Sequence, residues 1–233
     1  FDSSFLEFRR IYPLLKNKFK LIIPDLLGFG FSPRISNINY DSENLIINLT
    51  DLIQKLRITK KINIIGASMG GSVAFSLTKR KEENIAKIIL LSPAGLFTKP
   101  KKLPRPFNQI GAAFLGLPLV RKNLCRQAFA FPDQSVGEAE EQIASLHLGC
   151  KGWRNSLASF AKNGGFGGTY ENFENIKIKT ICGENDRILG YEELNKLKKI
   201  NNLNFVNLRR CGHLPHLDLP EITEKMIVDF LLS

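Results

Sequence analysis

The chain alternates short apolar runs with longer stretches in which apolar residues recur every three or four positions. We interpret the short runs as buried β-strands, because a strand covered on both faces is apolar throughout and lacks polar alternation. These runs lie at 19–24, 61–65, 87–91, 176–181 and 203–208.

The longer stretches predict amphipathic helices. In 41–57 the leucines and isoleucines line one helical face, and Asp41 is suited to cap its N-terminus. Further helices are expected from Ser68 to about residue 79, at 191–200 and at 220–232. Strands that alternate with helices predict an α/β fold, in which right-handed crossovers build a mostly parallel sheet flanked by helices.

One region breaks this alternation. No strand is predicted between residues 92 and 175, although helical-looking apolar segments occur there. A structureless loop of that length would be unusual inside a compact domain. We therefore expect a helical lid at 93–175, inserted over the carboxyl ends of strands in a core made of 1–92 and 176–233.

Composition limits the partners that we expect. The 233 residues include 33 Lys and Arg against 22 Asp and Glu, which gives a net charge of +11. The basic residues are spread along the chain without a recognition motif, so no nucleic-acid partner is predicted. The cysteines form no CxxC pair, which predicts free thiols in a reducing compartment such as the cytoplasm, and no metal site. The longest apolar tract, 107–120, is shorter than the roughly 20 residues that span a bilayer.

The segment Gly66-Ala67-Ser68-Met69-Gly70 lies between a predicted strand and a predicted helix. A nucleophile at such a sharp turn adopts a strained backbone conformation, and glycines two residues away on either side avoid collisions. The turn would lift the Ser68 hydroxyl to the end of the sheet and place the Met69 N–H at a helix N-terminus, which favours an anion. The alternative is a glycine-rich turn with an incidental serine. The glycine patterns of dinucleotide and phosphate loops are missing, so no cofactor is predicted.

A serine nucleophile needs a base, and the chain offers His147, His213 and His216. We predict His213, because it follows the run 203–208 and active-site groups gather at carboxyl ends of parallel strands. His216 is the alternative base, or else a structural histidine. His147 is expected on the surface or on a pocket wall of the lid.

The base in turn needs a carboxylate that fixes its tautomer and stabilises its cation. Asp186 follows the run 176–181 and is predicted for this role, with Glu184 as second choice; either could instead belong to a solvated turn. The order Ser68, Asp186, His213 is the one expected of α/β-hydrolases and differs from that of two other serine-triad folds.

With these residues, the sequence resembles the lid-bearing branch of the α/β-hydrolase superfamily from Phe1 to its C-terminal helix, most weakly in the lid. Gly66–Gly70 matches the family's nucleophile elbow. Gly183-x-x-Asp186 and Gly212-His213 match its acid and base segments, and Asp25-x-x-Gly28-x-Gly30-x-Ser32 resembles its loop after the fourth strand. A serine nucleophile argues against the haloalkane dehalogenase and epoxide hydrolase branches, which are expected to carry aspartate there.

The sequence departs from the family in one respect. Relatives place a His-Gly pair after their third strand, and the next residue donates the second oxyanion N–H. Here that pair would lie upstream of Phe1, and the third strand would lie between 19–24 and 61–65. We therefore expect the sequence to be a fragment of a longer protein whose N-terminal extension supplies strands one to three. As numbered, Phe1 is the expected second oxyanion donor beside Met69.

The resemblance implies a serine hydrolase that cleaves a carboxylic ester through an acyl-enzyme. Two alternatives stay open, a carbon–carbon bond hydrolase with the same triad and a non-catalytic binding protein. The apolar lid favours a lipophilic small-molecule substrate, with Phe114, Leu117 and Trp153 as expected pocket residues, although ordinary lid packing explains these side chains equally well. Basic residues beside this stretch could meet an anionic membrane surface or form a solvated lid edge: Lys99, Lys101, Lys102 and Arg105.

Overall fold

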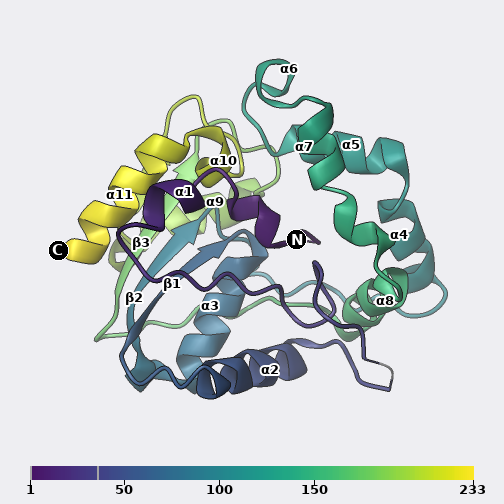
Figure 1. Ribbon diagram of the computed structural model, residues 1–233, viewed down its shortest axis with the longest axis horizontal. Helices are drawn as coiled ribbons and strands as arrows, with labels where there is room; N and C mark the ends of the chain where they lie inside the picture. Colours follow the sequence, from purple (N-terminus) through teal and green to yellow (C-terminus); the bar gives the residue numbers. More distant parts are fainter. Residues whose placement is uncertain (1, 36) are drawn as a thin grey trace.

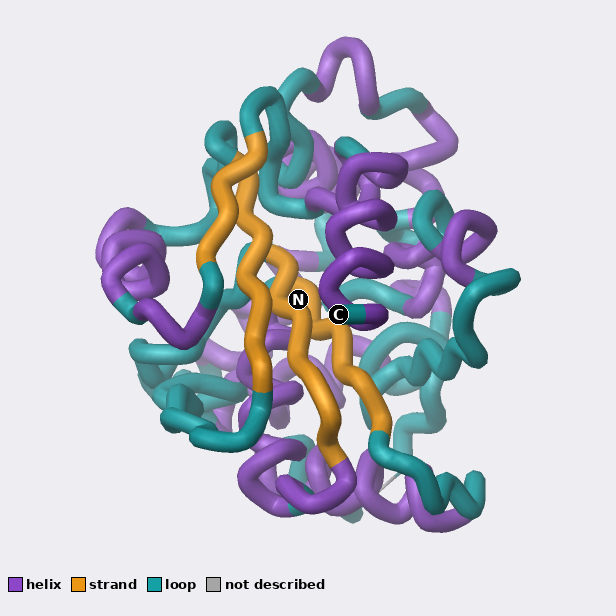
Figure 2. Tube along the Cα trace, turned by 90° about the vertical axis from the view of Figure 1, so that its left-hand side faces the viewer, coloured by secondary structure: helices purple, strands orange, loops and turns teal. Residues whose placement is uncertain are grey.

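The computed structural model describes residues 2–35 and 37–233. The described residues form a four-stranded, fully parallel sheet in the order β1-β2-β3-β4. Figure 2 shows the twisted strands side by side with helices on both sides. The strands are β1 (Ile62–Ala67), β2 (Ile85–Leu91), β3 (Lys177–Gly183) and β4 (Phe205–Leu208). The predicted α/β fold is confirmed, and so are four of the five predicted strands.

Both faces of the sheet are buried. On β2, Ile88 and Leu90 contact one layer of helices, which contains α3 and α9, whereas Ile89 and Leu91 contact the opposite layer, which contains α1 and α11. These helices are α1 (Tyr12–Leu15), α3 (Met69–Arg80), α9 (Tyr191–Lys199) and α11 (Pro220–Leu232). A continuous apolar run in the sequence thus corresponds to a strand between two cores.

The remaining elements of the sheet region are short, apart from the predicted helix at 41–57. That helix is α2, and the Asp41 side chain caps it by accepting a hydrogen bond from the Asn44 N–H at 2.9 Å. These elements are η1 (Phe5–Phe8), α2 (Ser42–Lys55), η2 (Glu82–Asn84), η4 (Asn201–Leu203) and α10 (Pro215–Asp218).

The segment between β2 and β3 is helical and contains no strand, all of its residues being described. Its helices form the right-hand side of the molecule in Figure 1, beside the carboxyl ends of the strands. They are α4 (Phe107–Leu115), α5 (Pro118–Gln127), α6 (Pro132–Ser135), α7 (Glu138–Ile143), η3 (Leu146–Gly149) and α8 (Trp153–Asn163). We refer to residues 107–163 as the lid.

The prediction of a strand at 19–24 is wrong. These residues form no regular element and make no ladder with β1, which is an edge strand among the described residues. The segment runs alongside β1 in Figure 1, and a cavity of about 680 Å³ is lined by both. Phe19 and Leu21 pack on the core. An apolar run in the sequence therefore indicates that its side chains are buried. It does not indicate whether another strand lies close enough to form backbone hydrogen bonds with it.

No helix within residues 2–35 and 37–233 is long and apolar enough to cross a membrane. The four cysteines are unpaired: Cys182 and Cys211 are buried, and Cys125 and Cys150 are half-buried.

Candidate active site

Ser68 occupies the turn between β1 and α3. Its backbone has φ 50° and ψ −121°, a conformation that non-glycine residues rarely adopt. Backbone hydrogen bonds hold this turn in place: the Ser68 N–H donates to the Leu91 carbonyl at 2.9 Å, and the Ser68 carbonyl accepts from the Ala94 N–H at 3.0 Å. The strained turn therefore projects the hydroxyl beyond the end of the sheet.

The two glycines that flank Ser68 differ. A Cβ on Gly66 would collide with the backbone of Gly70, as expected from the tightness of the turn. A Cβ on Gly70 would meet nothing within 4 Å. The prediction that a side chain at this second glycine would collide is therefore wrong. Gly70 lines the 680 Å³ cavity beside β1, and this open space is the reason.

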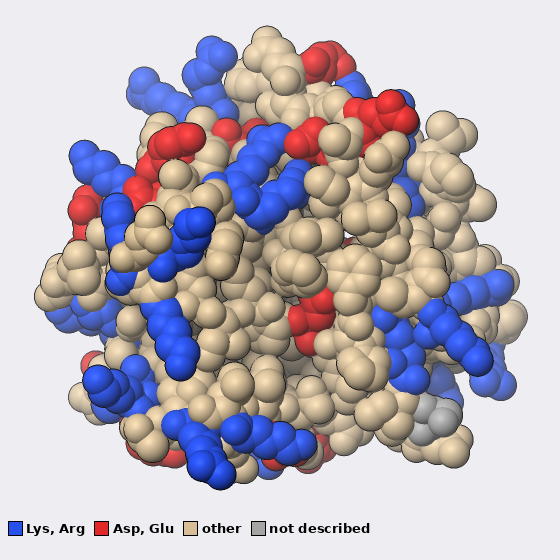
Figure 3. Space-filling view, viewed as in Figure 1, with Lys and Arg blue, Asp and Glu red and all other residues tan. Residues whose placement is uncertain are grey.

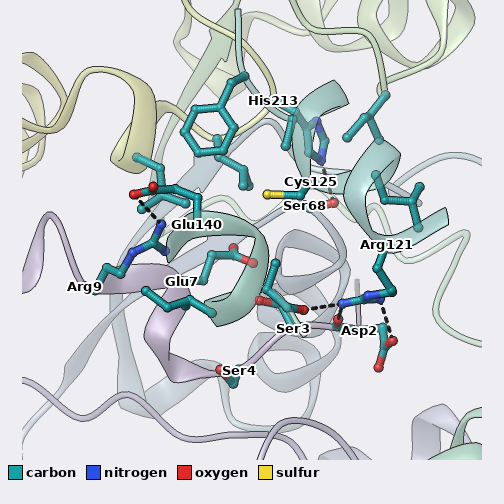
Figure 4. Close-up of a pocket in the computed structure, with 18 of the residues that line it drawn as sticks. Asp2, Ser3, Ser4, Glu7, Arg9, Ser68, Arg121, Cys125, Glu140 and His213 are labelled. Carbon is teal, nitrogen blue, oxygen red and sulfur yellow. Dashed lines mark hydrogen bonds and ion pairs between the residues drawn. The ribbon is translucent and has the colours of Figure 1, made fainter. Parts of the chain in front are cut away.

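The structure brings Ser68, His213 and Asp186 together. His213 Nε2 lies 2.8 Å from Ser68 Oγ, and His213 Nδ1 lies 2.8 Å from Asp186 Oδ2. All three side chains are buried. Figure 4 shows the His213 ring pointing toward Ser68. A carboxylate at Nδ1 places the proton on that nitrogen, which leaves Nε2 free to accept the serine proton.

Asp186 is held as a carboxylate. Burial opposes its ionisation, but the hydrogen bond and charge of His213 outweigh burial and lower the pKa of Asp186 below 3.8. Its other oxygen, Oδ1, accepts the backbone N–H groups of Ile188 at 2.8 Å and Leu189 at 2.9 Å. An anion fixed on both oxygens is suited to orienting an imidazole and stabilising its cation.

The alternative residues lie elsewhere. Glu184 is exposed. His216 is fully buried, stacks on Phe8 with ring centroids 4.8 Å apart, and lies 3.4 Å from the Glu7 carboxylate. His147 is also fully buried, which corrects the expectation that it lies on the surface or on a pocket wall. Its Nε2 lies 3.3 Å from Asp2 Oδ1, so it packs inside a polar cluster that no local sequence pattern indicates.

Met69 is the first residue of α3, beside Ser68. The first N–H groups of a helix have no carbonyl one turn earlier to accept them, so the Met69 N–H is available to a developing anion. The predicted second donor, Phe1, lies outside the described residues.

The loop that carries His213 is tied to the lid through the backbone. The His213 N–H donates to the Ala128 carbonyl at 2.8 Å. Asp218 Oδ2 accepts from the N–H of Gly212 at 2.6 Å and from the N–H of Ala130 at 2.9 Å. Sequence reasoning missed Asp218, because a carboxylate shortly after the histidine carries no distinctive signal. It acts as a positioning residue for the histidine loop.

A cavity of about 230 Å³ opens beside Ser68 and His213 (Figure 4). Its apolar wall contains Leu115, Leu124, Ala128, Phe129, Ile143, Ile188, Leu214 and Leu217. Of the predicted pocket residues, Phe114 and Leu117 are more than half exposed and do not line this cavity. Trp153 is buried and does not line the cavity either; its Nε1 donates to Oδ1 of Asp2, which does line it, at 2.9 Å.

Asp2 joins the start of the chain to the lid. Its carboxylate accepts from Arg121 of α5 at 2.9 Å, besides its contacts with His147 and Trp153. Burial opposes ionisation of Asp2, but the His147 hydrogen bond and the Arg121 charge lower its pKa below 3.8. We call Asp2, Arg121, His147 and Trp153 the Asp2 cluster.

Comparison with known proteins identifies the family of this chain. A model of the alpha/beta hydrolase fold family matches residues 3–128. The chain is 30% identical to the alpha/beta hydrolase domain-containing protein VTE7 of Arabidopsis thaliana, over 99% of this chain and 71% of that protein. The chain therefore belongs to the alpha/beta hydrolase family.

Relatives of lower sequence identity are named for different activities. The chain is 23% identical to 2-hydroxy-6-oxo-6-(2'-aminophenyl)hexa-2,4-dienoic acid hydrolase of Metapseudomonas resinovorans, over 97% of this chain and 78% of that protein. It is 24% identical to human monoacylglycerol lipase ABHD6, over 96% and 70%. A solved meta-cleavage product hydrolase from Pseudomonas fluorescens superposes with a TM-score of 0.80 at 20% identity, covering 98% of this chain and 85% of that one, which shows the shared fold.

Proposed function

We propose that this protein is a serine hydrolase that cleaves a carboxylic ester through an acyl-enzyme. The observation that carries the proposal is the hydrogen-bonded series Ser68–His213–Asp186 at the edge of an apolar cavity. Membership of a hydrolase family supports the same conclusion. No step in this chemistry requires a cofactor.

The geometry supports a two-stage mechanism. His213 Nε2 takes the Ser68 proton while Ser68 Oγ attacks the ester carbonyl carbon, and the Met69 N–H stabilises the resulting oxyanion. The intermediate expels the alcohol, which leaves with the proton from His213. A water molecule then gives a proton to His213 and attacks the acyl carbon, after which Ser68 leaves with that proton. Asp186 stays ionised throughout and holds the imidazole.

The cavity supports a lipophilic substrate of modest size. Its wall is mainly apolar, and its volume of about 230 Å³ is below the ~300–1,000 Å³ of typical drug-sized sites. The cationic side chains on its rim are already paired, Arg121 with Asp2 and Arg9 with Glu140, the latter at 3.5 Å. A neutral apolar ester therefore fits this site better than a strongly charged one.

Carbon–carbon bond hydrolysis is the second candidate, because relatives named as dienoate hydrolases match nearly the whole chain. A third possibility is a binding protein that keeps the fold without catalysis. A fluorophosphonate probe should label Ser68 in an active enzyme and would leave a non-catalytic site unlabelled. A panel of short and medium p-nitrophenyl esters beside a ring-cleavage diketone distinguishes the two hydrolases by relative kcat/KM.

The test of the proposal is Ser68→Ala, with Ser76→Ala in the helix that follows Ser68, α3, as matched control. Loss of the nucleophile should lower ester kcat by at least about 10³-fold, while circular dichroism and the unfolding midpoint stay unchanged. Ser76→Ala should keep full activity. Equal activity of the Ser68→Ala and wild-type proteins, both purified to homogeneity, would refute the assignment.

We also propose a reducing compartment, such as the cytoplasm, as the location of the protein. The support for this proposal is that all four cysteines are unpaired, as is usual where thiols are kept reduced. Alkylation of freshly lysed cells under denaturing conditions should modify all four cysteines without prior reduction; a requirement for reductant would contradict this location.

A further inference from the structure

The outer face of α4 is apolar and exposed. Phe107, Ile110 and Phe114 recur at helical spacing, so they lie on one face, and each is more than half exposed. The opposite face carries the buried residues Asn108 and Ala112. An apolar helical face turned away from the core is unusual, because such a face normally packs on the protein.

The exposed apolar surface continues beyond α4. Leu117 and Leu119, in the turn into α5 and at its start, are 51% and 75% exposed, and Leu103 precedes the helix. We call Leu103, Phe107, Ile110, Phe114, Leu117 and Leu119 the lid patch. Single exposed apolar residues are common, but a continuous set of this kind marks an interaction surface.

The surroundings of the lid patch are cationic. Lys99, Lys101, Lys102 and Arg105 are all exposed, and none of them forms an ion pair with the described residues. Arg154 adds a further cation beside α4, since its side chain donates to the Gln109 carbonyl at 3.4 Å. The sequence contains no Asp or Glu from residue 84 to residue 132.

The charges around the lid patch favour an anionic lipid surface over a second copy of this chain as its partner. Figure 3 shows an uncharged surface over the lid helices at the right of the molecule, with Lys and Arg side chains gathered below it. Two copies of this chain joined through their lid patches would bring like-charged flanks together, each on a protein of net charge +11. An anionic lipid surface satisfies both features, because it offers phosphates to the cations and an acyl boundary to the apolar side chains.

We infer that the lid patch docks on the surface of an anionic lipid bilayer. Phe107, Ile110 and Leu119 enter the boundary between headgroups and acyl chains, and the flanking lysines contact lipid phosphates. The lid lies flat on the membrane and does not span it.

Docking has a consequence that rests on the proposed function. Leu115, at the end of α4, and Leu124 of α5 line the cavity beside Ser68. The membrane-facing and cavity-facing residues thus share the same two helices, so docking brings the cavity to a bilayer that can supply a lipophilic ester.

Vesicle flotation tests the inference with the intact chain. We expect the protein to float with vesicles of phosphatidylcholine and phosphatidylglycerol at least about tenfold more than with phosphatidylcholine alone, and to be released by high salt. Phe107→Glu combined with Ile110→Glu should reduce flotation by about tenfold or more. The matched control is Ile222→Glu, a half-exposed residue of α11 at the opposite side of the molecule (Figure 1), which should float like the wild type.

A second pair of variants tests the charge. Lys101→Glu with Lys102→Glu should weaken flotation, whereas Lys198→Glu with Lys199→Glu on α9, also exposed, should weaken it much less. Equal losses in the two pairs would show that only net charge matters and would overturn a docking site on the lid.

Other outcomes also contradict the inference. Absence of flotation of the wild type, or equal flotation of the Phe107→Glu/Ile110→Glu and Ile222→Glu proteins, would refute membrane docking. A wild-type dimer in light scattering that Phe107→Glu/Ile110→Glu converts to a monomer, without vesicle binding, would assign the patch to a second copy. A failure of the proposed function can be told apart from a failure of docking, because the Ser68→Ala protein should float like the wild type and the Phe107→Glu/Ile110→Glu protein should hydrolyse water-soluble esters normally.

Discussion

The carboxyl edge of the sheet and the lid are held in place by different forces. At the edge, backbone contacts at van der Waals limits fix each loop: a Cβ on Gly183 would collide with the carbonyls of Cys211 and Gly212. In the lid, α5 is held largely by side chains, among which the buried pair Arg121–Asp2 is central. The residues that we propose for catalysis therefore lie where the backbone cannot shift, whereas the lid beside them is held through a few replaceable side-chain contacts.

The lid itself is not uniform. Its α8 side packs into the apolar core, where the rings of Phe160 and Phe29 lie 5.0 Å apart at right angles. Its α5–α7 side is held by a smaller apolar cluster around Phe129 and by ion pairs, such as that between Arg10 and Glu140 at 2.7 Å. We therefore expect opening of the cavity to begin at α5–α7 and not at α8.

The largest effect should come from the edge of the sheet. Asp186→Asn removes the anion that orients His213, and should lower kcat by about 10³–10⁴-fold without unfolding the protein. Glu184→Gln, an exposed neighbour in the same loop, should retain nearly full activity. Steady-state kinetics on one ester measure kcat for both variants. Similar losses in both variants would mean that the loop, and not this carboxylate, supports catalysis.

The attachment of the lid should show the next largest effect. Asp2→Asn leaves the Arg121 charge buried without its counter-ion, which typically costs about 3–5 kcal/mol. We expect a lower urea midpoint and faster proteolysis within 118–147. The control is Asp133→Asn, whose partner Arg126 forms an exposed pair worth about 0–1 kcal/mol. Equal destabilisation by the two variants would show that the Asp2 cluster does not anchor the lid.

A smaller effect is expected from substituting glycines, one at the carboxyl edge of the sheet and one in the lid. Gly183→Ala should destabilise the protein by about 1–3 kcal/mol and lower kcat, because the added methyl group pushes the acid loop away from the histidine loop. Gly149→Ala in the lid meets nothing within 4 Å and should change stability by less than about 1 kcal/mol. Thermal unfolding and kinetics measure both. A tolerant Gly183 would mean that the edge is less rigid than its contacts indicate.

The smallest effect concerns acid stability. The folded protein holds the pKa of Asp186 below its ordinary value of 3.8, so ionised Asp186 stabilises the fold above pH ~4 and this contribution disappears as the pH falls through the folded pKa. The stability difference between wild type and Asp186→Asn should therefore be constant from pH 7 to pH 5 and shrink below pH ~4. Urea titrations at each pH measure it. A difference that grows on acidification would contradict the direction of the shift.

Much of the sheet and its edge could be predicted from sequence. Buried parallel strands leave continuous apolar runs, and chemical groups that follow such runs meet at one edge, which brought Ser68, Asp186 and His213 together in the prediction. The run at 19–24 failed because strand pairing depends on a neighbour that local sequence does not specify.

The lid was much less predictable. In α4 apolar residues occupy nearly every position, so periodicity could not tell that Phe114 faces outward while Leu115 faces the cavity. The burial of His147 depends on Asp2, a residue far away in the sequence. Long-range polar contacts of this kind leave no periodic signal.

The backbone bond from His213 to Ala128 has a consequence for engineering. Replacing the lid with the corresponding segment of another protein would remove this hydrogen bond, which holds the loop of the catalytic base candidate His213, unless the new segment places a carbonyl at the position of Ala128. Grafts that retain residues 128–130 should preserve turnover, and those that replace them should yield a well-folded chimera with a misaligned imidazole.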